Sequence, residues 1–320
     1  MRLDRQIFAV PQSGFYTTDA FTDYAVEFLD QASKRRQPFF LYVAHNAPHF
    51  PLHAPDHEIT KYRGGYMAGW DRVRARRFER MKKMGLIDPA WPLTSRDAIV
   101  HAWDSLTARQ KTDQDLLMAV YAAMVDRLDR NIGRLLAHLD ELGVADNTLV
   151  MFLSDNGGCS YDFNRTPRVA PGPADSFRSY NSPWANASNT PFRLYKQWSH
   201  EGGVSTPLIV SWPTAIQSGG GLTDRVDHLI DIMPTCLEIT GAEYPRRLGG
   251  RDILSMEGLS LITVFSGGTA RKEEPIYWKF LGNRAVRQGK WKLVAERTKD
   301  WESSGYPTLP YAPLHKTLYL

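Results

Sequence analysis

Four histidines stand at regular intervals near the amino-terminal end, where their ring nitrogens could bind a metal ion or move a proton. They occupy every fourth position, at His45, His49, His53 and His57. On a helix this spacing would form a metal-binding stripe. Prolines separate them, however, and a proline inside a helix costs about 3 kcal/mol or more. The sequence therefore predicts an extended or looped segment, in which one histidine can act singly.

A carboxylate and an amide stand side by side at Asp155 and Asn156, directly after the apolar run 148–154 and directly before two glycines. In open α/β sheets, ligands bind outside the carboxyl ends of the strands. Carboxylate and amide oxygens are hard donors that suit Ca²⁺ or Mg²⁺. Asp-Asn-Gly is also a favourable turn sequence, so the residues by themselves leave a metal site and a simple turn both open.

A third polar segment, KQWSHEGGV, begins at Lys196, includes His200 and leads into the apolar run 207–212. Lysine supplies a compact positive charge, and glycines let the backbone approach a bound anion closely. An anion site and a solvated turn are both compatible with this segment.

Neither cysteine nor serine occurs here in a local sequence that is typical of a catalytic nucleophile. The chain has two cysteines, Cys159 and Cys236, which cannot form a disulfide framework or a cysteine-based zinc site. There is also no Gly-x-Ser-x-Gly segment of the kind that presents a catalytic serine.

The hydrophobic pattern predicts the elements that must position these residues. Helical spacing of apolar residues predicts helices at 17–33, 66–84, 113–142 and 231–240. An unbroken apolar run predicts a strand buried on both faces at 38–45, and similar runs predict another buried strand at 148–154 and a further strand at 207–212. Thr17 or Thr18 can cap the first helix, and Thr112 or Asp113 the third. A long helix followed by a buried strand is the crossover unit of an α/β sheet.

The remaining segments complete the predicted organisation. Residues 157–195 lack periodicity and predict a long loop, which at this length is functional or disordered. Beyond about residue 270 the pattern predicts antiparallel strands joined at Gly289. We therefore expect an α/β domain at 1–268, with a mostly parallel central sheet flanked by helices, and a small antiparallel α+β subdomain at 269–320.

Composition narrows the class of protein. The 320 residues are 42% hydrophobic and 23% charged, which is ordinary for a globular protein. The net charge is +4, and the basic residues are scattered apart from the stretch 72–83, so we expect no nucleic-acid partner. No stretch approaches the roughly 20 apolar residues that span a bilayer, and the amino terminus lacks the apolar core of a signal peptide.

Several blocks, in order, resemble the sulfatases of the alkaline phosphatase superfamily. They are PFFLYVAHNAPHFPLHAP at 38–55, the basic segment 61–88, LVMFLSDNGG at 149–158 and FRLYKQWSHEGGVSTPLIVSWP at 192–213. The upstream segment FYTTDAFTDYAVEFL also fits, so the resemblance covers nearly the whole chain. It implies an alkaline phosphatase-like fold.

The resemblance also implies roles for particular residues. Asp155 and Asn156 match ligands of an active-site Ca²⁺, for which Mg²⁺ is the less suitable substitute. Lys196 matches a lysine that holds the sulfate group. His49 matches a histidine that contacts the sulfate ester and assists the leaving oxygen. His200 lies in a variable position and is expected as a neighbour of the substrate.

The departures from the family pattern concern the nucleophile. Family members carry Cys-x-Pro/Ala-x-Arg, whose cysteine is oxidised to formylglycine, and neither Cys159 nor Cys236 has that context. The resemblance therefore implies that the amino-terminal part is missing and that formylglycine belongs to the complete protein. We expect the chain alone to be inactive, to bind metal weakly, and to aggregate or need a complementary amino-terminal segment.

The expected function is hydrolysis of a sulfate ester by an arylsulfatase-like protein of which this chain is a part. A phosphoesterase of the same superfamily and a non-catalytic, anion-binding pseudoenzyme remain as alternatives. Family habit suggests a periplasmic or secreted protein, and the natural substrate does not follow from the sequence.

Overall fold

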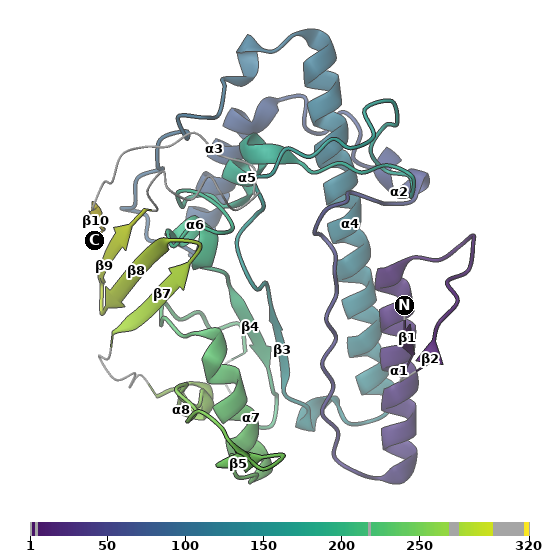
Figure 1. Ribbon diagram of the computed structural model, residues 1–320, viewed down its shortest axis with the longest axis vertical. Coiled ribbons are helices and arrows are strands. Elements are labelled where there is room, and N and C mark those ends of the chain that lie inside the picture. Colours follow the sequence, from purple (N-terminus) through teal and green to yellow (C-terminus); the bar gives the residue numbers. More distant parts are fainter. Residues whose placement is uncertain (1, 4–5, 217–218, 269–274, 297–316, 320) are drawn as a thin grey trace. The chain divides into compact units, whose positions relative to one another are not determined.

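The computed structural model describes residues 2–3, 6–216, 219–268, 275–296 and 317–319 (Figure 1). The chain divides into two units. The first unit comprises Met1–Ala145 and Gly157–Ser205, and the second comprises Asp146–Asn156 and Thr206–Leu320. The second unit is therefore interrupted in sequence by a segment that belongs to the first. The predicted domain boundary at 268/269 stays a prediction, and parts of the predicted subdomain, 269–274, 297–316 and 320, lie outside the described residues.

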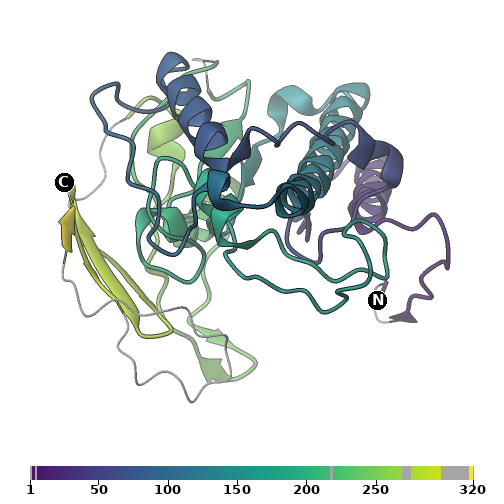
Figure 2. The same cartoon turned by 90° about the horizontal axis from the view of Figure 1, so that it is seen from above.

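Two helices of the first unit, α1 (Thr17–Arg35) and α4 (Ala108–Glu141), lie side by side (Figures 1 and 2). Both follow their predicted periodicity, but their starts differ from the prediction. Tyr16 precedes α1 without a side-chain cap. Thr107 begins α4 through a capping box with Gln110, so the predicted caps at Thr112 and Asp113 are wrong. The Thr-x-x-Gln pair satisfies exposed backbone N–H groups one turn earlier than the apolar pattern indicates.

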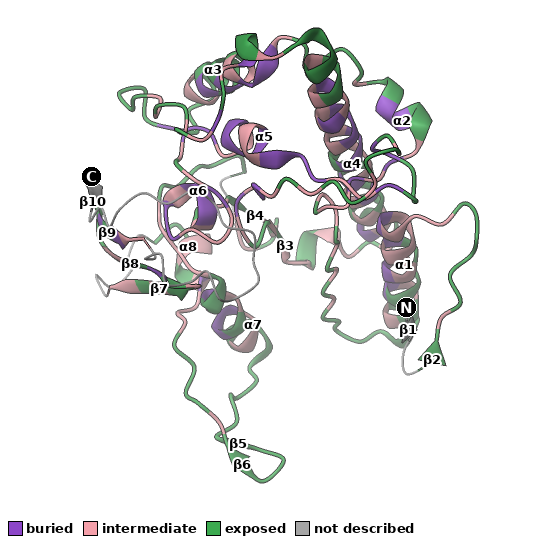
Figure 3. Cartoon of the chain, turned by 45° about the horizontal axis from the view of Figure 1, so that its top comes forward, coloured by how far each residue is buried: buried purple, intermediate pink, exposed green. Residues whose placement is uncertain are grey.

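Residues of four shorter elements share a buried core with α4 (Figure 3). These elements are α2 (Asp56–Thr60), α3 (Gly69–Lys83), the 3-10 turn Trp103–Ser105 and α5 (Asn181–Ser188). The first unit also contains α6 (Glu201–Val204) and, near the amino terminus, the small pair β1 (Arg2–Leu3) and β2 (Gln6–Ile7). Three tryptophans meet edge to face, with the Trp70 ring 4.8 Å from Trp103 and 5.5 Å from Trp184. Trp184 is fully buried, so α5, within the predicted loop 157–195, is an anchor of the core.

A buried ion network joins α2 to α4. The Glu58 carboxylate, whose side chain is 1% exposed, accepts hydrogen bonds from Lys61 at 2.6 Å, from Arg127 at 3.2 Å and from Arg130. Arg127 also donates to Asp19 of α1. Glu58 therefore pairs with three cations where these helices meet, and Asp19 and Asp126 pair with the same cations.

The predicted strand at 38–45 is wrong. Residues 37–46 form neither helix nor strand, and Phe40 and Tyr42 are 76% and 81% exposed. A strand forms only when a neighbour satisfies its backbone hydrogen bonds, and no described strand pairs with this segment. The same absence of helix confirms that His45, His49 and His53 do not line a helical stripe; His57 lies in α2.

The second unit contains β3 (Val150–Leu153) and β4 (Leu208–Ser211), both at predicted positions. They pair with each other antiparallel, and every strand pair among the described residues is antiparallel, so the predicted parallel sheet is not observed. The strand at 148–154 is expected to be buried, but Phe152 is 42% exposed, and its partner strand β4 exposes Ile209 at 59%.

The rest of the second unit agrees with the predicted pattern where it is described. Helix α7 (Ile232–Thr240) follows the 3-10 turn Leu229–Asp231 and ends at Gly241. The antiparallel strands expected near the carboxyl terminus are β7 (Ile276–Phe280), β8 (Asn283–Gln288) and β9 (Trp291–Ala295), beside β10 (Thr317–Tyr319). The remaining elements are β5 (Arg247–Leu248), β6 (Arg251–Asp252) and α8 (Ile262–Phe265).

Among the residues that the structure describes, no helix combines the length and the apolar character that crossing a membrane requires.

Substituting alanine for a glycine inside α4 and for a glycine just past its end should change the free energy of unfolding in opposite directions. Neither Gly133, inside α4, nor Gly143, just past it, has an atom within 4 Å of the position that a Cβ would take. Gly133→Ala should therefore raise the free energy of unfolding by about 0.5–1 kcal/mol, because alanine loses less backbone entropy in a helix. Gly143 has φ +69°, so Gly143→Ala should lower it by about 1 kcal/mol. Urea unfolding of both variants checks the sign of each change.

Candidate functional site

His49 and Lys196, which the resemblance to sulfatases assigns to the leaving oxygen and to the sulfate group, meet in the first unit. Lys196 Nζ lies 3.2 Å from His49 Nε2, although 147 positions separate them in sequence. His49 is exposed and Lys196 is half-buried, so the pair is open to solvent on the histidine side. A cationic group and a proton-carrying ring at this distance form a pair that can bind an anionic group and exchange a proton with it.

The hydrogen bonds of His49 define which ring nitrogen carries the proton. Nδ1 lies 2.7 Å from the Phe50 carbonyl oxygen, which can only accept, so Nδ1–H is the donor. In the neutral ring Nε2 is then the acceptor, and the Lys196 ammonium donates to it. Nδ1 therefore fixes the ring, while Nε2 is the nitrogen that faces the cation.

Aromatic rings hold His49 in place from one side. Its ring centroid lies 4.3 Å from that of Phe50, at an interplanar angle of 32°. Phe50 in turn meets Phe163 at 5.2 Å and Tyr161 at 6.0 Å, both edge to face. Such edge-to-face pairs favour defined ring orientations, so the position of His49 depends on a cluster built partly from residues far along the chain.

The turn that carries Lys196 has an unusual backbone. Leu194 and Gln197, on either side of Tyr195-Lys196, have φ of 62° and 79°, which non-glycine residues rarely adopt. Conformations of this kind persist only where surrounding contacts enforce them, and they cluster at functional sites. Here Lys196 N–H donates to Gly158 O at 3.0 Å.

Asn189 ties the same turn to the Gly157-Gly158 segment. Its Oδ1 accepts from Gly158 N–H at 2.8 Å, and its Nδ2 donates to Leu194 O at 2.9 Å. One side chain therefore links both backbone segments next to Lys196.

Tyr161 connects the two halves of the pair. Its hydroxyl accepts a hydrogen bond from Gln197 Nε2, next to Lys196, and its ring packs against Phe50, next to His49. Tyr161 and Gln197 are therefore positioning residues of the His49–Lys196 pair.

The two glycines after His200 let α6 pack against this turn at very close range. A Cβ on Gly203 would lie 2.1 Å from Trp198 O and 2.4 Å from Tyr195 O. Gly203 O also accepts from Gly157 N–H at 3.1 Å, which joins the two ends of the segment 157–205. Glycine is required here because backbone atoms occupy the space of a side chain.

His200 lies four residues after Lys196, and Cys159 directly follows Gly158. Both side chains are buried. His200 is 3% exposed, with its ring centroid 6.2 Å from that of Trp198, so its proposed place beside the substrate stays a prediction. Burial raises the pKa of the Cys159 thiol, which disfavours the reactive thiolate. This agrees with the sequence-based exclusion of Cys159 as a nucleophile.

Asp155 and Asn156 follow β3 in the second unit. Ser154 Oγ donates to Asn156 O at 2.9 Å, and Thr206 Oγ1 donates to Ser154 O at 2.7 Å, so this end of the strand is a hydrogen-bonded turn. The Asp155 carboxylate is exposed and has no partner within the described part of the chain.

The donor set of this turn fits Ca²⁺ in type but not in number. Two hard oxygen side chains fall short of the usual six to eight ligands. The described residues also contain no group of three or more His, Cys, Asp or Glu side chains that could hold a metal ion. Asp155 and Asn156 can thus supply only part of a coordination shell, and their role as metal ligands stays a prediction.

Comparison with known proteins identifies the family. A family model described as Sulfatase matches residues 2–242. An uncharacterized sulfatase of Schizosaccharomyces pombe is 34% identical over 298 residues, which cover 88% of this chain and 53% of the relative. An arylsulfatase of Klebsiella aerogenes is 33% identical over 263 residues, which cover 78% of this chain and 56% of that protein. The chain belongs to the sulfatase family.

Solved structures share the fold. The crystal structure of Ps i-CgsB in complex with k-i-k-neocarrahexaose matches with a TM-score of 0.56 and 24% identity, over 89% of this chain and 47% of that chain. The phosphonate monoester hydrolase SpPMH from Silicibacter pomeroyi matches with a TM-score of 0.52 and 21% identity, over 87% and 51%. The present chain spans about half the length of the curated relatives that it matches.

Proposed function

We propose that this chain forms part of the site of a sulfuric ester hydrolase and supplies the groups that hold the sulfate and protonate the leaving oxygen. Membership of the sulfatase family supports the reaction class. The observation that carries the assignment of residues is the 3.2 Å approach of Lys196 Nζ to His49 Nε2.

The two side chains have different tasks in this proposal. The Lys196 ammonium moves from His49 Nε2 to an oxygen of the bound sulfate, where its charge offsets that of the ester. His49 donates a proton from Nε2 to the leaving oxygen as the sulfur–oxygen bond breaks, and Nε2 must therefore carry a proton when the ester is bound. The bond from Nδ1–H to Phe50 O holds the ring throughout.

Asp155 and Asn156 are proposed to contribute two oxygen ligands to a Ca²⁺ ion, or less favourably Mg²⁺. A bound cation of this kind would polarise the sulfate oxygens. The nucleophile is proposed to be a formylglycine hydrate of the complete protein, because neither Cys159 nor Cys236 has the sequence context for that modification.

The alternatives make different predictions about turnover. A phosphoesterase would prefer phosphate or phosphonate esters, and a pseudoenzyme would bind anions without hydrolysing either ester. Comparing initial rates on 4-nitrophenyl sulfate and 4-nitrophenyl phosphate with the full-length gene product distinguishes all three.

Lys196→Ala should lower the affinity of this chain for inorganic sulfate by about tenfold or more, because a charge-assisted hydrogen bond contributes about 1.5–3 kcal/mol. Isothermal titration with sulfate at low ionic strength measures the change. In the wild type, the His49 ring resonances should also shift on sulfate addition, and this shift should vanish in Lys196→Ala.

The matched control is Lys61→Ala, which removes a lysine of the same unit that is paired with Glu58 and Asp126. It should leave sulfate affinity unchanged. Equal affinities in wild type and Lys196→Ala would remove the basis for assigning the sulfate to this pair.

A further inference from the structure

The basic residues of α3 lack the acidic partners that the arginines of α4 have. Arg127, Arg130 and Arg134 on α4 each pair with at least one carboxylate. Helix α3 carries seven basic residues against two acidic ones, Asp71 and Glu79. Asp71 pairs with Arg96 outside the helix. Within the described part of the chain, no basic residue of α3 forms an ion pair.

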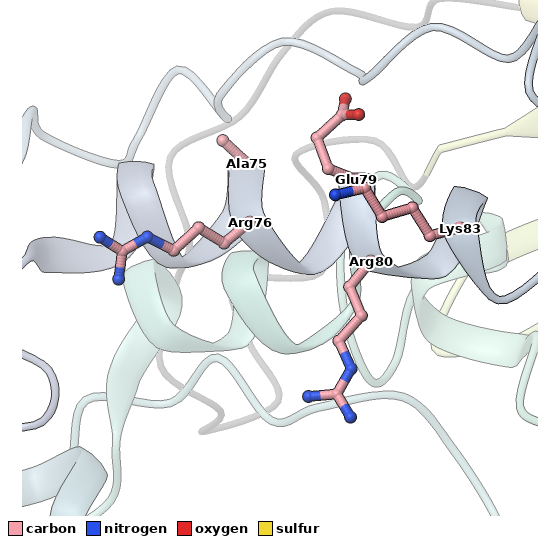
Figure 4. Close-up of a pocket in the computed structure, with 5 residues that line it drawn as sticks. All are labelled: Ala75, Arg76, Glu79, Arg80 and Lys83. Atoms are coloured by element: carbon pink, nitrogen blue, oxygen red, sulfur yellow. The ribbon is translucent and has the colours of Figure 1, made fainter.

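Four of these cations form one exposed row. They lie at successive turns of α3, at positions Arg72, Arg76, Arg80 and Lys83, and all four are exposed. A rise of 1.5 Å per residue makes the row about 16 Å long. Ala75, Arg76, Glu79, Arg80 and Lys83 line a shallow, open pocket on this helix. Figure 4 shows the Arg76 and Arg80 side chains extending from the helix in different directions.

Two of the remaining three basic residues are engaged in other ways. Arg74 is buried and donates to Thr94 Oγ1, and Lys82 lies 4.4 Å from the Phe78 ring centroid. Arg77 is exposed but lies off the row, on a different side of the helix. The exposed row therefore stands apart from the residues that hold α3 on the core.

Such a row is unfavourable for an isolated helix. Like charges four residues apart, as at Arg72, Arg76 and Arg80, repel each other. Lys83 gains from the negative end of the helix dipole, whereas Arg72 and Arg76 lie too far from that end to do so. The repulsion is relieved when an anionic partner neutralises the row.

We propose that this face of α3 binds a linear sulfated polysaccharide. The choice of sulfate groups rests on the proposed function of the chain. The row occupies one side of the helix over about 16 Å, which fits an extended chain carrying several anionic groups rather than a single small anion. A guanidinium group can pair with two oxygens of one anionic group through two parallel hydrogen bonds, and two of the cations that line the pocket are arginines.

The surface chemistry favours a sugar polymer over single-stranded nucleic acid. Proteins that bind single strands usually stack the bases on exposed aromatic rings. The aromatic residues of α3, Trp70 and Phe78, are 3% and 5% exposed, so this face offers charge without a stacking platform.

Binding of fluorescein-labelled dextran sulfate, followed by anisotropy at increasing salt, tests the proposal. The wild type should bind at low salt and release the polymer as salt rises, and uncharged dextran should not bind. The triple variant R76Q/R80Q/K83Q should bind about tenfold more weakly or worse, with a shallower dependence on salt, because fewer counterions are released. Glutamine is used because it is a good helix former. If the triple variant does not fold, Arg80→Gln alone should also weaken polymer binding, by a smaller factor.

The control K34Q/R35Q/R168Q removes three other basic residues and should bind like the wild type. Lys196→Ala should also retain polymer binding, even where it loses inorganic sulfate, so the two proposals can fail separately. A wild type that does not bind dextran sulfate, a control that loses as much as the α3 variant, or tighter binding of a single-stranded oligonucleotide of equal charge would each overturn the proposal.

Discussion

Gly203→Ala should destabilise the first unit by about 1–3 kcal/mol or more and at the same time weaken sulfate binding as strongly as Lys196→Ala. A Cβ at this position would lie 2.1 Å from Trp198 O and 2.4 Å from Tyr195 O. Both are backbone atoms, so relief requires movement of the turn that carries Lys196. That movement would separate Lys196 Nζ from His49 Nε2. Sulfate titration and urea unfolding of the same sample measure the two effects.

Gly258→Ala is the matched control for this variant. Its Cβ would meet Ile230 O at 2.0 Å, an equally severe backbone contact, but Gly258 belongs to the second unit. It should lower stability without changing sulfate affinity. If Gly203→Ala binds sulfate like the wild type, close packing of α6 is not what fixes the Lys196 turn.

Glu58→Ala should lower the free energy of unfolding by about 1–3 kcal/mol at pH 7, because Lys61, Arg127 and Arg130 lose the hydrogen bonds to its carboxylate. The loss stays below that of a fully buried pair broken from one side, since Asp126 and Asp19 still pair with these cations. Glu79→Gln is the control, because this exposed glutamate forms no ion pair within the described residues, and it should change stability by less than about 0.5 kcal/mol. Urea unfolding at pH 7 measures both variants.

The same carboxylate predicts how stability depends on pH. Burial acts to raise the pKa of Glu58, but hydrogen bonds from Arg130 and Lys61 outweigh it and lower the pKa from 4.5 to about 2. The unfolded chain therefore binds the proton first as pH falls. The stabilisation is complete above about pH 4.5 and is lost progressively towards pH 2. Glu58→Gln should show a shallower loss over this range, and an unchanged slope would contradict the assignment.

The hydrophobic pattern predicts helices more reliably than strand pairing in this chain. It places α1, α3, α4 and α7 within a few residues of their observed bounds, because their apolar residues recur at helical spacing over several turns. An apolar run such as 38–45 indicates only that its side chains favour burial. It does not define a pairing partner, and without one the segment has no strand and exposes Phe40 and Tyr42.

The candidate site could be predicted only in part, for a related reason. His49 and Lys196 are recognisable from the surrounding sequence blocks. Tyr161, Asn189 and Gln197 carry no comparable local signal, since their roles arise from contacts across long stretches of chain. The φ of 79° at Gln197 is not indicated by residue type, because glutamine rarely adopts it.

The hydrogen bond from Gly157 N–H to Gly203 O has a consequence for the order of folding. Strands β3 and β4 are separated by roughly fifty residues, and closing so long a loop is entropically costly. Once Gly157 and Gly203 are joined, the free chain between the strands shortens to roughly ten residues, which lowers the closure cost by about 1.5 kcal/mol. The contact between the two ends of the segment 157–205 should therefore form before β3 and β4 pair, and it should accelerate their pairing.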